Sequence, residues 1–211
     1  MPVFKSGQDC APQWCELEDF DIIELPPGGK AKFSRVALRE KLIVTSGTCD
    51  LTFGNKTVRA KKGDCLDLDA DAGSFEVVSA SPDCAVVRMS GRWGEHTGGF
   101  GLFSVTRCDS PRDGGDPAGY AKATNFDSHY HDCDEYWIIV KGCGIAVSEG
   151  RAYIVGPGDC VATGMGHHHD FPQVFEPVEA VYFETTMQGR KRAGHLWEHA
   201  HGPAEPEKER I

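Results

Sequence analysis

The chain has 211 residues and a formal net charge of −10 at pH 7. This length accommodates one large all-β domain or two small ones, and it allows a sizeable core. The negative charge argues against nucleic acid and anionic membrane surfaces as partners. No apolar stretch reaches the ~18 residues of a transmembrane helix. The first residues lack the apolar segment of a signal peptide, so we expect a cytoplasmic protein.

Short apolar runs separated by turn residues dominate the chain and predict an all-β fold. They fill residues 21–89 and resume from Tyr120 to about Thr186, with a glycine-rich break between. We expect at most a short helix, near residues 190–199. The predicted divisions are an N-terminal barrel, a glycine-rich linker, a C-terminal barrel and a tail, at 1–95, 96–119, 120–190 and 191–211.

The two β-rich halves repeat one another. At a shift of 95 positions (135 − 40 = 95), Glu40 falls on Glu135 and Gly47 on Gly142. The same shift places Gly63-Asp64-Cys65 on Gly158-Asp159-Cys160, and no gap is needed. Repeats of this length predict two copies of one β-domain rather than a solenoid.

Two histidines and a glutamate are spaced so that they can meet. In an extended strand, residues i and i+2 point to the same face, so His129 and His131 can converge. Glu135 shares their parity and can join them if the strand bends. Imidazole and carboxylate groups suit a divalent Fe, Mn, Ni, Co or Zn ion. The alternative is a polar strand end with two solvated histidines.

The second half contains a further cluster, His167-His168-His169. By strand parity, His167, His169 and Phe171 share one face, and His168 points to the other, where we expect it to be exposed. Nine cysteines without a Cys-x-x-Cys pair predict small buried hydrophobes in a reducing compartment. Cys133 is the exception to watch, because it lies between two candidate ligands.

These motifs together resemble the cupin superfamily. His129-x-His131-x-x-x-Glu135, followed by six residues and Gly142, is similar to the first cupin motif. Pro157-x-Asp159, with a histidine ten residues after the Asp, is similar to the second. The resemblance covers most of residues 20–186. It implies two tandem cupin barrels, which are jelly-roll-like double-sheet β-barrels.

The resemblance also implies one divalent metal in the C-terminal barrel, bound by His129, His131, Glu135 and His169. His167 could replace His169 or act as a nearby base. The shift of 95 carries the three histidines to Ser34, Val36 and Ser74, and only Glu40 survives. We therefore expect the N-terminal barrel to be structural and metal-free, lining a pocket or forming a dimer interface.

His195, Glu198 and His199 also match the inverted zinc-protease pattern H-x-x-E-H. Little chain remains there to build a protease cleft. We instead expect a short terminal helix that packs Leu196 and Trp197 on the barrel mouth.

Polar residues near the predicted metal supply candidates for proton transfer. Asp127 or Glu184 could act as general base, and Tyr182 or His167 as general acid. Each could equally be a polar group of the barrel rim with no role in catalysis. The first functional hypothesis is an isomerase, epimerase or lyase acting on a sugar or a small hydroxy or keto acid. In it the metal acts as Lewis acid and stabilises an enediolate.

Two other functions remain open at this point. One is an Fe(II)-dependent dioxygenase, which the same ligand set permits. The other is a non-catalytic module that binds or senses a small molecule. In each case the expected partner is a small molecule, and the resemblance together with the metal-free half makes a homodimer plausible.

Overall fold

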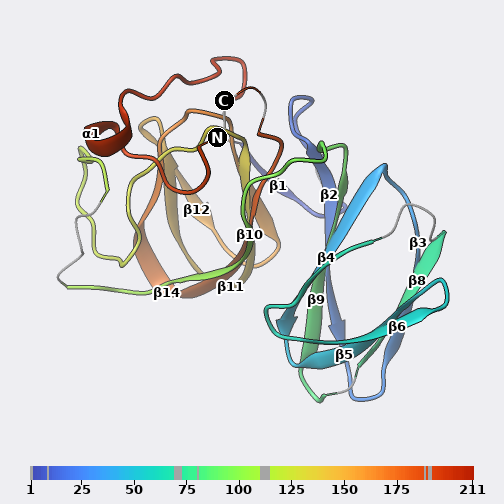
Figure 1. Cartoon of the computed structure of the whole chain (residues 1–211). Coiled ribbons are helices and arrows are strands. Elements are labelled where there is room, and N and C mark those ends of the chain that lie inside the picture. The colour runs from blue at the N-terminus through green and yellow to red at the C-terminus, as the bar shows by residue number, and fades with distance from the viewer. Residues whose placement is uncertain are drawn as a thin grey trace. The chain divides into compact units, whose positions relative to one another are not determined.

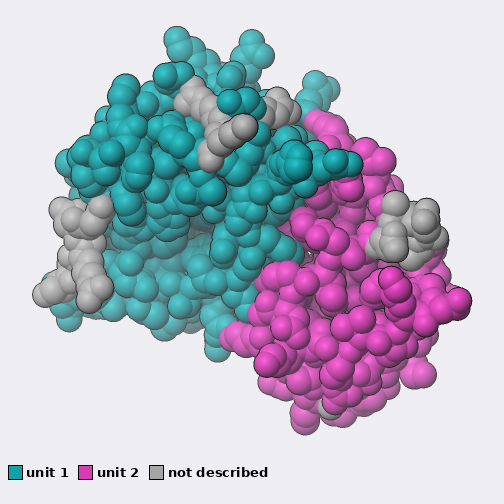
Figure 2. Space-filling view, viewed as in Figure 1, with its two compact units in different colours: residues 1–16, 94–211 teal, residues 17–93 magenta. Residues whose placement is uncertain are grey.

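The computed structural model describes residues 2–8, 10–68, 73–79, 81–109, 115–187, 189 and 192–211. The chain divides into two compact units (Figure 2). Unit 1 comprises Met1–Glu16 with Gly94–Ile211, and unit 2 comprises Leu17–Trp93. Residues 110–114 of the expected linker lie outside the described residues. Both units are built from antiparallel strands, which confirms the all-β prediction.

Unit 2 consists of two four-stranded sheets (Figure 1). The first has, in spatial order, β2 (Leu17–Leu25), β9 (Cys84–Gly91), β4 (Arg39–Ser46) and β7 (Cys65–Asp67). The second has β3 (Lys30–Ser34), β8 (Ser74–Ser79), β5 (Thr48–Phe53) and β6 (Lys56–Lys61). Burial alternates along β8, as in a strand with one face on a core. That core takes residues from both sheets, such as Val44, Leu51, Val77 and Val86.

Unit 1 contains a six-stranded sheet (Figure 1). Its strands are β1 (Val3–Lys5), β13 (Asp159–Thr163), β11 (Glu135–Ser148), β14 (His169–Glu184), β10 (Phe100–Val105) and β12 (Arg151–Val155). The long strands β11 and β14 pair with several register shifts, including one between Ile145 and Val147. Such bulges bend a strand, which lets the sheet curve around a core. Trp137, Ile139 and Phe171 lie in that core, as their parity predicts.

The pairing of strands confirms the internal repeat. Leu42 of β4 pairs with Leu66 of β7, and Trp137 of β11 pairs with Val161 of β13. Both members of the second pair lie 95 positions after those of the first (137 − 42 = 95; 161 − 66 = 95). The two units therefore share strand register as well as sequence pattern.

The expectation that the repeat needs no gap is wrong in its last strand. Leu42 also pairs with Arg88 of β9, whereas Trp137 pairs with Tyr182 of β14. The shift there is 94 rather than 95 (182 − 88 = 94). One residue fewer in unit 1 thus changes which residues of the two units occupy equivalent places.

Gly142 and Gly47 are equivalent turn positions that require glycine. Their φ angles are +73° and +66°, in the region that side chains disfavour. A Cβ at Gly142 would also overlap the carbonyl of Pro177, and one at Gly47 would overlap Ser81 Oγ. The glycine of the first cupin motif is therefore explained by backbone conformation and close packing.

The compact units have other bounds than the predicted domains. Strand β1 pairs with β13, so residues 1–16 belong to the C-terminal barrel. Strand β10 lies inside the expected linker and pairs with β14 along its whole length. These pairings join segments far apart in the chain, which composition and local pattern do not reveal.

The tail beyond the last strand includes one short helix, α1 (Glu198–His201). It falls close to the expected helical segment at 190–199. The described part of the chain contains no helix with the length and apolarity needed to cross a membrane.

Candidate metal centre

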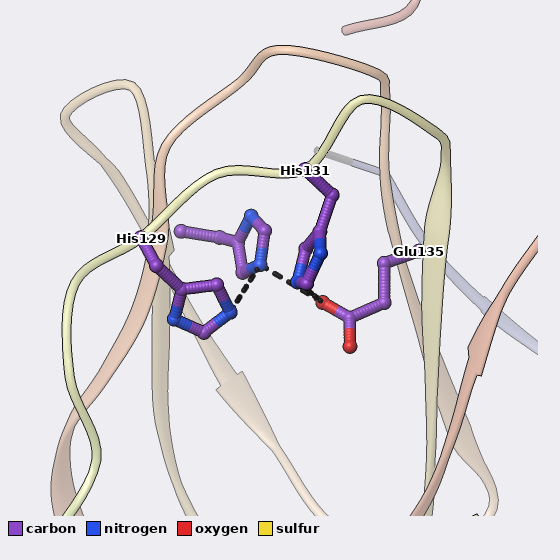
Figure 3. A group of neighbouring side chains, drawn as sticks. His129, His131 and Glu135 are labelled. Carbon is purple, nitrogen blue, oxygen red and sulfur yellow. Dashed lines mark hydrogen bonds and ion pairs between the residues drawn. The ribbon is translucent and has the colours of Figure 1, made fainter. Parts of the chain in front are cut away.

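Four predicted ligands meet at the end of unit 1 where β11 and β14 begin. His129 and His131 lie just before β11, Glu135 is its first residue, and His169 is the first residue of β14. A pair of backbone hydrogen bonds joins His129 to His169, with N to O distances of 3.2 and 2.9 Å. Figure 3 shows His129, His131 and Glu135 pointing toward one another. Strand pairing therefore brings together residues that are 40 positions apart.

The ligand atoms of His129, His131, Glu135 and His169 lie within 4.8 Å of one another. His169 Nε2 is 3.0 Å from His129 Nε2 and 2.8 Å from Glu135 Oε2. His131 Nε2 is 3.5 Å from the same carboxylate oxygen. All four residues are buried, with at most 4% of their surface exposed. Ligands around a divalent ion at ~2.1 Å are separated by up to ~4 Å, so this cluster is close to the required size.

The hydrogen bonds of the rings fix which nitrogen faces inward. His129 Nδ1 donates to the carbonyl of Asp127 at 3.0 Å, and His169 Nδ1 donates to that of His167 at 2.9 Å. A carbonyl only accepts, so in each neutral ring Nε2 carries a lone pair; this tautomer is assigned from the partners. Backbone carbonyls orient both rings in the way that is common for metal-binding histidines.

The cluster fits a cation. The inward lone pairs of His129 and His169 and an oxygen of Glu135 would repel one another at these distances without positive charge among them. His131 Nε2 and Glu135 Oε2 are buried and have no hydrogen-bond partner among the described residues. Buried polar atoms without partners are costly. Three imidazoles and one carboxylate are a donor set suited to a divalent transition metal.

The electrostatics favour the protonation states that bind metals. Burial lowers the pKa of His131 to about 4, against the opposing charge of Glu135. Burial likewise holds the pKa of His129 well below its usual value. Burial alone would raise the pKa of Glu135, but the adjacent His131 and His169 lower it to about 2. Neutral imidazoles and an ionised carboxylate are the forms that bind a metal without first losing protons.

Glu184, a candidate base, lies beside the cluster. It is the last residue of β14 and pairs with Glu135, and its Oε1 is 3.9 Å from His131 Nδ1. The backbone N–H of Gly99 donates to Glu184 Oε2 at 2.8 Å. Burial raises the pKa of Glu184. A Cβ at Gly98 would overlap this carboxylate, so the glycine-rich segment read as a linker packs directly against it.

Asp127, the other candidate base, lies at the Nδ1 edge of His129, whereas the ligand cluster is at the Nε2 edge. Its carboxylate accepts a hydrogen bond from Trp197 Nε1 at 2.8 Å and lies 3.3 Å from His195 Nδ1. Burial would raise the pKa of Asp127, but His195 and Trp197 outweigh it and lower the value. The carboxylate is thus ionised and held by two side chains of the C-terminal tail.

The two candidate acids lie elsewhere. Tyr182 packs with Phe103 at the apolar core, with ring centroids 6.4 Å apart. His167 Nε2 donates to the carbonyl of Glu207 at 2.9 Å, and its ring is outside the ligand cluster. The parity argument that placed His167 and His169 on one face fails because β14 begins only at His169.

His168 and Cys133 are also outside the cluster. His168 Nε2 lies 2.9 Å from Asp116 Oδ2, and its side chain is 27% exposed. Cys133 is buried, and burial raises the pKa of its thiol, which keeps it protonated. Neither side chain belongs to a group of possible metal ligands among the described residues.

Sequence reasoning missed the contribution of the C-terminal tail. The ring of His195 stacks on that of His129, with centroids 3.7 Å apart and an angle of 4° between planes. Leu196 is buried, as expected, but the expectation that the terminal helix carries Leu196 and Trp197 is wrong, because both residues precede α1, which has no buried residue. Burial favours neutral His195, but Asp127, Glu135 and Glu184 outweigh it and raise its pKa. The H-x-x-E-H pattern was the available signal, although its residues serve a different purpose here.

In unit 2, the glutamate equivalent to Glu135 has a different partner. Glu40 accepts hydrogen bonds from Arg88 Nε and Nη2, the latter at 2.9 and 3.0 Å. The backbone N–H of Val36 donates to Glu40 Oε1 at 2.6 Å. The guanidinium also lies over the rings of Phe33 and Phe75, at 5.5 and 5.3 Å from their centroids. A buried ion pair therefore occupies the place of the ligand cluster.

Comparisons with known proteins agree with this architecture. No protein-family model matches the chain. It is 45% identical over 211 residues to the uncharacterized protein y4oW of Sinorhizobium fredii, covering 100% of this chain and 97% of that protein. Its fold is similar to that of YlbA from E. coli, with a TM-score of 0.53 and 13% identity over 90% of this chain and 92% of that one.

A second solved structure of this kind is the oxalate decarboxylase of Bacillus subtilis, whose Mn(II) centres have been studied. The TM-score is 0.52 at 9% identity, over 77% of this chain and 67% of that one. Both are bicupin-like, and identities this low establish the fold alone. The chain therefore has a bicupin-like fold and belongs to one family with y4oW of Sinorhizobium fredii.

Proposed function

We propose that this protein is a metal-dependent enzyme with isomerase, epimerase or lyase chemistry on a sugar or a small hydroxy or keto acid. The observation that carries the proposal is the buried convergence of three imidazoles and one carboxylate, with a further carboxylate beside them. His129, His131, Glu135 and His169 would hold the ion. A divalent ion bound there would supply Lewis acidity toward a carbonyl or hydroxyl oxygen.

The residues around the ligands support proton-transfer chemistry. Gly99 binds one oxygen of Glu184, which leaves Oε1 on the side of His131 to accept or return a proton. The carboxylate of Asp127 is occupied by Trp197 and His195, so it suits orientation better than proton transfer. The oxalate decarboxylase with a similar fold has Mn(II) centres, so a fold of this kind can hold a divalent metal.

The test combines metal analysis with a substrate screen. Plasma emission gives the metal of the purified protein, and an oxygen electrode follows O2. Hydroxy acids, keto acids and sugars are then incubated in D2O and followed by proton NMR. We expect Mn, Zn, Ni or Co, with deuterium exchange or a new product and no O2 uptake. Glu184→Gln should keep the metal and lose the exchange.

Two outcomes would replace the proposal. Iron together with substrate-dependent O2 consumption would establish the dioxygenase alternative. Tight binding of a compound without turnover anywhere in the panel would establish a binding or sensor module.

A further inference from the structure

The C-terminal segment Arg192–His201 is hydrogen-bonded to the residues just before β11, which include the ligand His131. Leu196 and Tyr130 exchange two backbone hydrogen bonds, each 3.0 Å long. Arg192 donates from Nε and Nη2 to the buried carboxylate of Asp132, at 2.7 and 2.8 Å. Tyr130 and Asp132 flank the ligand His131, so this attachment fixes the segment next to the metal centre.

The segment places His195 between solvent and the ligands. Its ring covers His129 at 3.7 Å and lies 5.5 Å from that of His131, measured between centroids. The side chain of His195 is 43% exposed, whereas those of the two ligands are at most 2% exposed. A molecule that approaches the ligands along this side therefore meets His195 first.

Possible ligand atoms of Asp127, His129 and His195 also lie within 4.8 Å of one another, but the ring stacking argues against His195 binding the same ion as His129. An imidazole binds a metal through a lone pair that lies in the plane of its ring. The rings of His195 and His129 are stacked face to face and almost parallel, so their planes share no point near either ring. By contrast, the rings of His129 and His131 are inclined at 88°, and their planes intersect at the cluster. His195 is a neighbour of the metal position rather than a part of it.

Among the described residues, only one of the two ring nitrogens of His195 has a partner. Nδ1 faces the carboxylate of Asp127 at 3.3 Å, and Trp197 fixes that carboxylate from the same segment. The described residues provide no hydrogen-bond partner for Nε2. A ring anchored on one side, with a free polar atom on the other, is suited to orienting a bound molecule.

We propose that His195 positions the substrate by hydrogen bonding through Nε2 to a hydroxyl group next to the oxygen that reaches the metal. A hydroxyl both donates and accepts, so it pairs with either form of the ring, whereas a carboxylate pairs only with the protonated form. This inference rests on the proposed function and narrows its substrates to hydroxylated compounds such as 2-hydroxy acids. Asp127 and Trp197 are then positioning residues for His195.

The test compares two probes that differ by one hydroxyl, glycolate and acetate. Full-length protein is loaded with Co(II), and each probe is titrated while the visible absorbance of the cobalt is followed. His195→Ala should weaken glycolate about 2- to 10-fold, the value of one lost hydrogen bond. Acetate affinity and cobalt stoichiometry should not change. His195→Gln, which restores a donor and an acceptor, should recover most of the glycolate affinity.

His96→Ala is the matched control, since His96 is exposed and outside the cluster. Equal effects on glycolate and acetate, or no effect on either, would overturn the inference. Loss of cobalt in His195→Ala would do so too, because it would make His195 a ligand. Wild-type protein that takes up cobalt but binds neither probe overturns the inference and leaves the metal site standing. Wild-type protein that takes up no metal overturns the proposed function as well.

Discussion

Each of the two barrels buries a glutamate, and the negative charge of that glutamate has different neighbours in the two barrels. The two glutamates lie near the start of equivalent strands, Glu40 in β4 and Glu135 in β11. In unit 2 a side chain of the protein supplies the compensating positive charge, the guanidinium of Arg88. In unit 1 burial lowers the pKa values of His129 and His131, so these two imidazoles supply little positive charge beside the glutamate. A buried carboxylate requires compensating positive charge; among the described residues Arg88 supplies it in unit 2, and in unit 1 a cation from solution would supply it.

Strand register shows how little separates the two arrangements. Arg88 occupies the place that Tyr182 has in unit 1, because both pair with equivalent residues of the neighbouring strand. In unit 2, Phe75 pairs with Phe53, and in unit 1, His169 pairs with Ser148. Ser148 lies 95 positions after Phe53 (148 − 53 = 95), so the two are equivalent. Phe75 therefore occupies the place of the ligand His169. The ring of Phe75 supports the guanidinium through a cation–π contact. Arg88 thus pairs with Glu40 where His131 and His169 face Glu135 in unit 1.

The largest expected effect is on metal content. His131→Ala removes a ligand whose inward nitrogen has no other partner, and bound metal should fall at least about tenfold. Arg88→Met in the other barrel should leave metal content unchanged. Plasma emission on both dialysed proteins provides the measurement. Stoichiometric metal in His131→Ala would show that the four residues do not form one site.

The next effect concerns stability in unit 2. Arg88→Met leaves Glu40 buried without its cation and should lower the free energy of unfolding by about 3–5 kcal/mol. Adding Glu40→Met should recover much of that loss, because the buried charge is then removed as well. Hydrogen exchange followed by mass spectrometry on β4 and β9 reports this unit specifically.

Arg59→Met is the control for that measurement. Arg59 pairs with Asp50 in the same unit, but its side chain is 61% exposed. Its loss should cost less than about 1 kcal/mol. Similar costs for the two arginines would mean that the Arg88 pair contributes no more than a surface ion pair.

The smallest effect is a local response to acid, expected only in unit 1. Burial would raise the pKa of Asp116, but hydrogen bonds from the Glu198 N–H, His168 and His199 outweigh it and lower the value. A lowered folded pKa gives stability that is complete above the unfolded value of about 4 and is lost as the pH falls further. The C-terminal segment of metal-free protein should therefore loosen below about pH 4, which the indole N–H signal of Trp197 reports by NMR.

Asp116→Asn should reduce this loosening and leave only the part due to Asp127, which holds Trp197 and also has a lowered pKa. A Trp197 signal that follows the same acid transition in both proteins would assign the loosening to another group.

The sequence predicts the ligand cluster well because its spacing is local. His129, His131 and Glu135 lie within seven positions, and the repeat at 95 positions correctly predicts the register of β4 with β7 and of β11 with β13. Parity succeeds where strands are regular, as for Trp137. It fails at Gln173, which shares the parity of His169 and Phe171 but is exposed, because the register of β11 and β14 shifts nearby.

Contacts between residues far apart in the sequence could not be predicted from local spacing. Arg88 lies 48 positions from Glu40, and an arginine on a strand carries no sign of a buried partner. His195 reaches His129 because the tail folds back through the pairing of Leu196 with Tyr130. No sequence periodicity links the C-terminal segment to the residues it contacts, so its composition alone indicates only a polar tail.

Unit 1 takes its first strand, β1, from before unit 2 and the remainder from after it. During synthesis, unit 2 has all of its strands by Trp93, whereas β1 must wait until β13 emerges. Arg210, made later still, pairs with Asp134 beside the ligand Glu135. Since domains fold as units once their parts are available, a nascent chain completes the arginine–glutamate barrel well before the histidine barrel. A metal held by the four ligands would therefore be bound only after β13, β14 and Arg210 have been made.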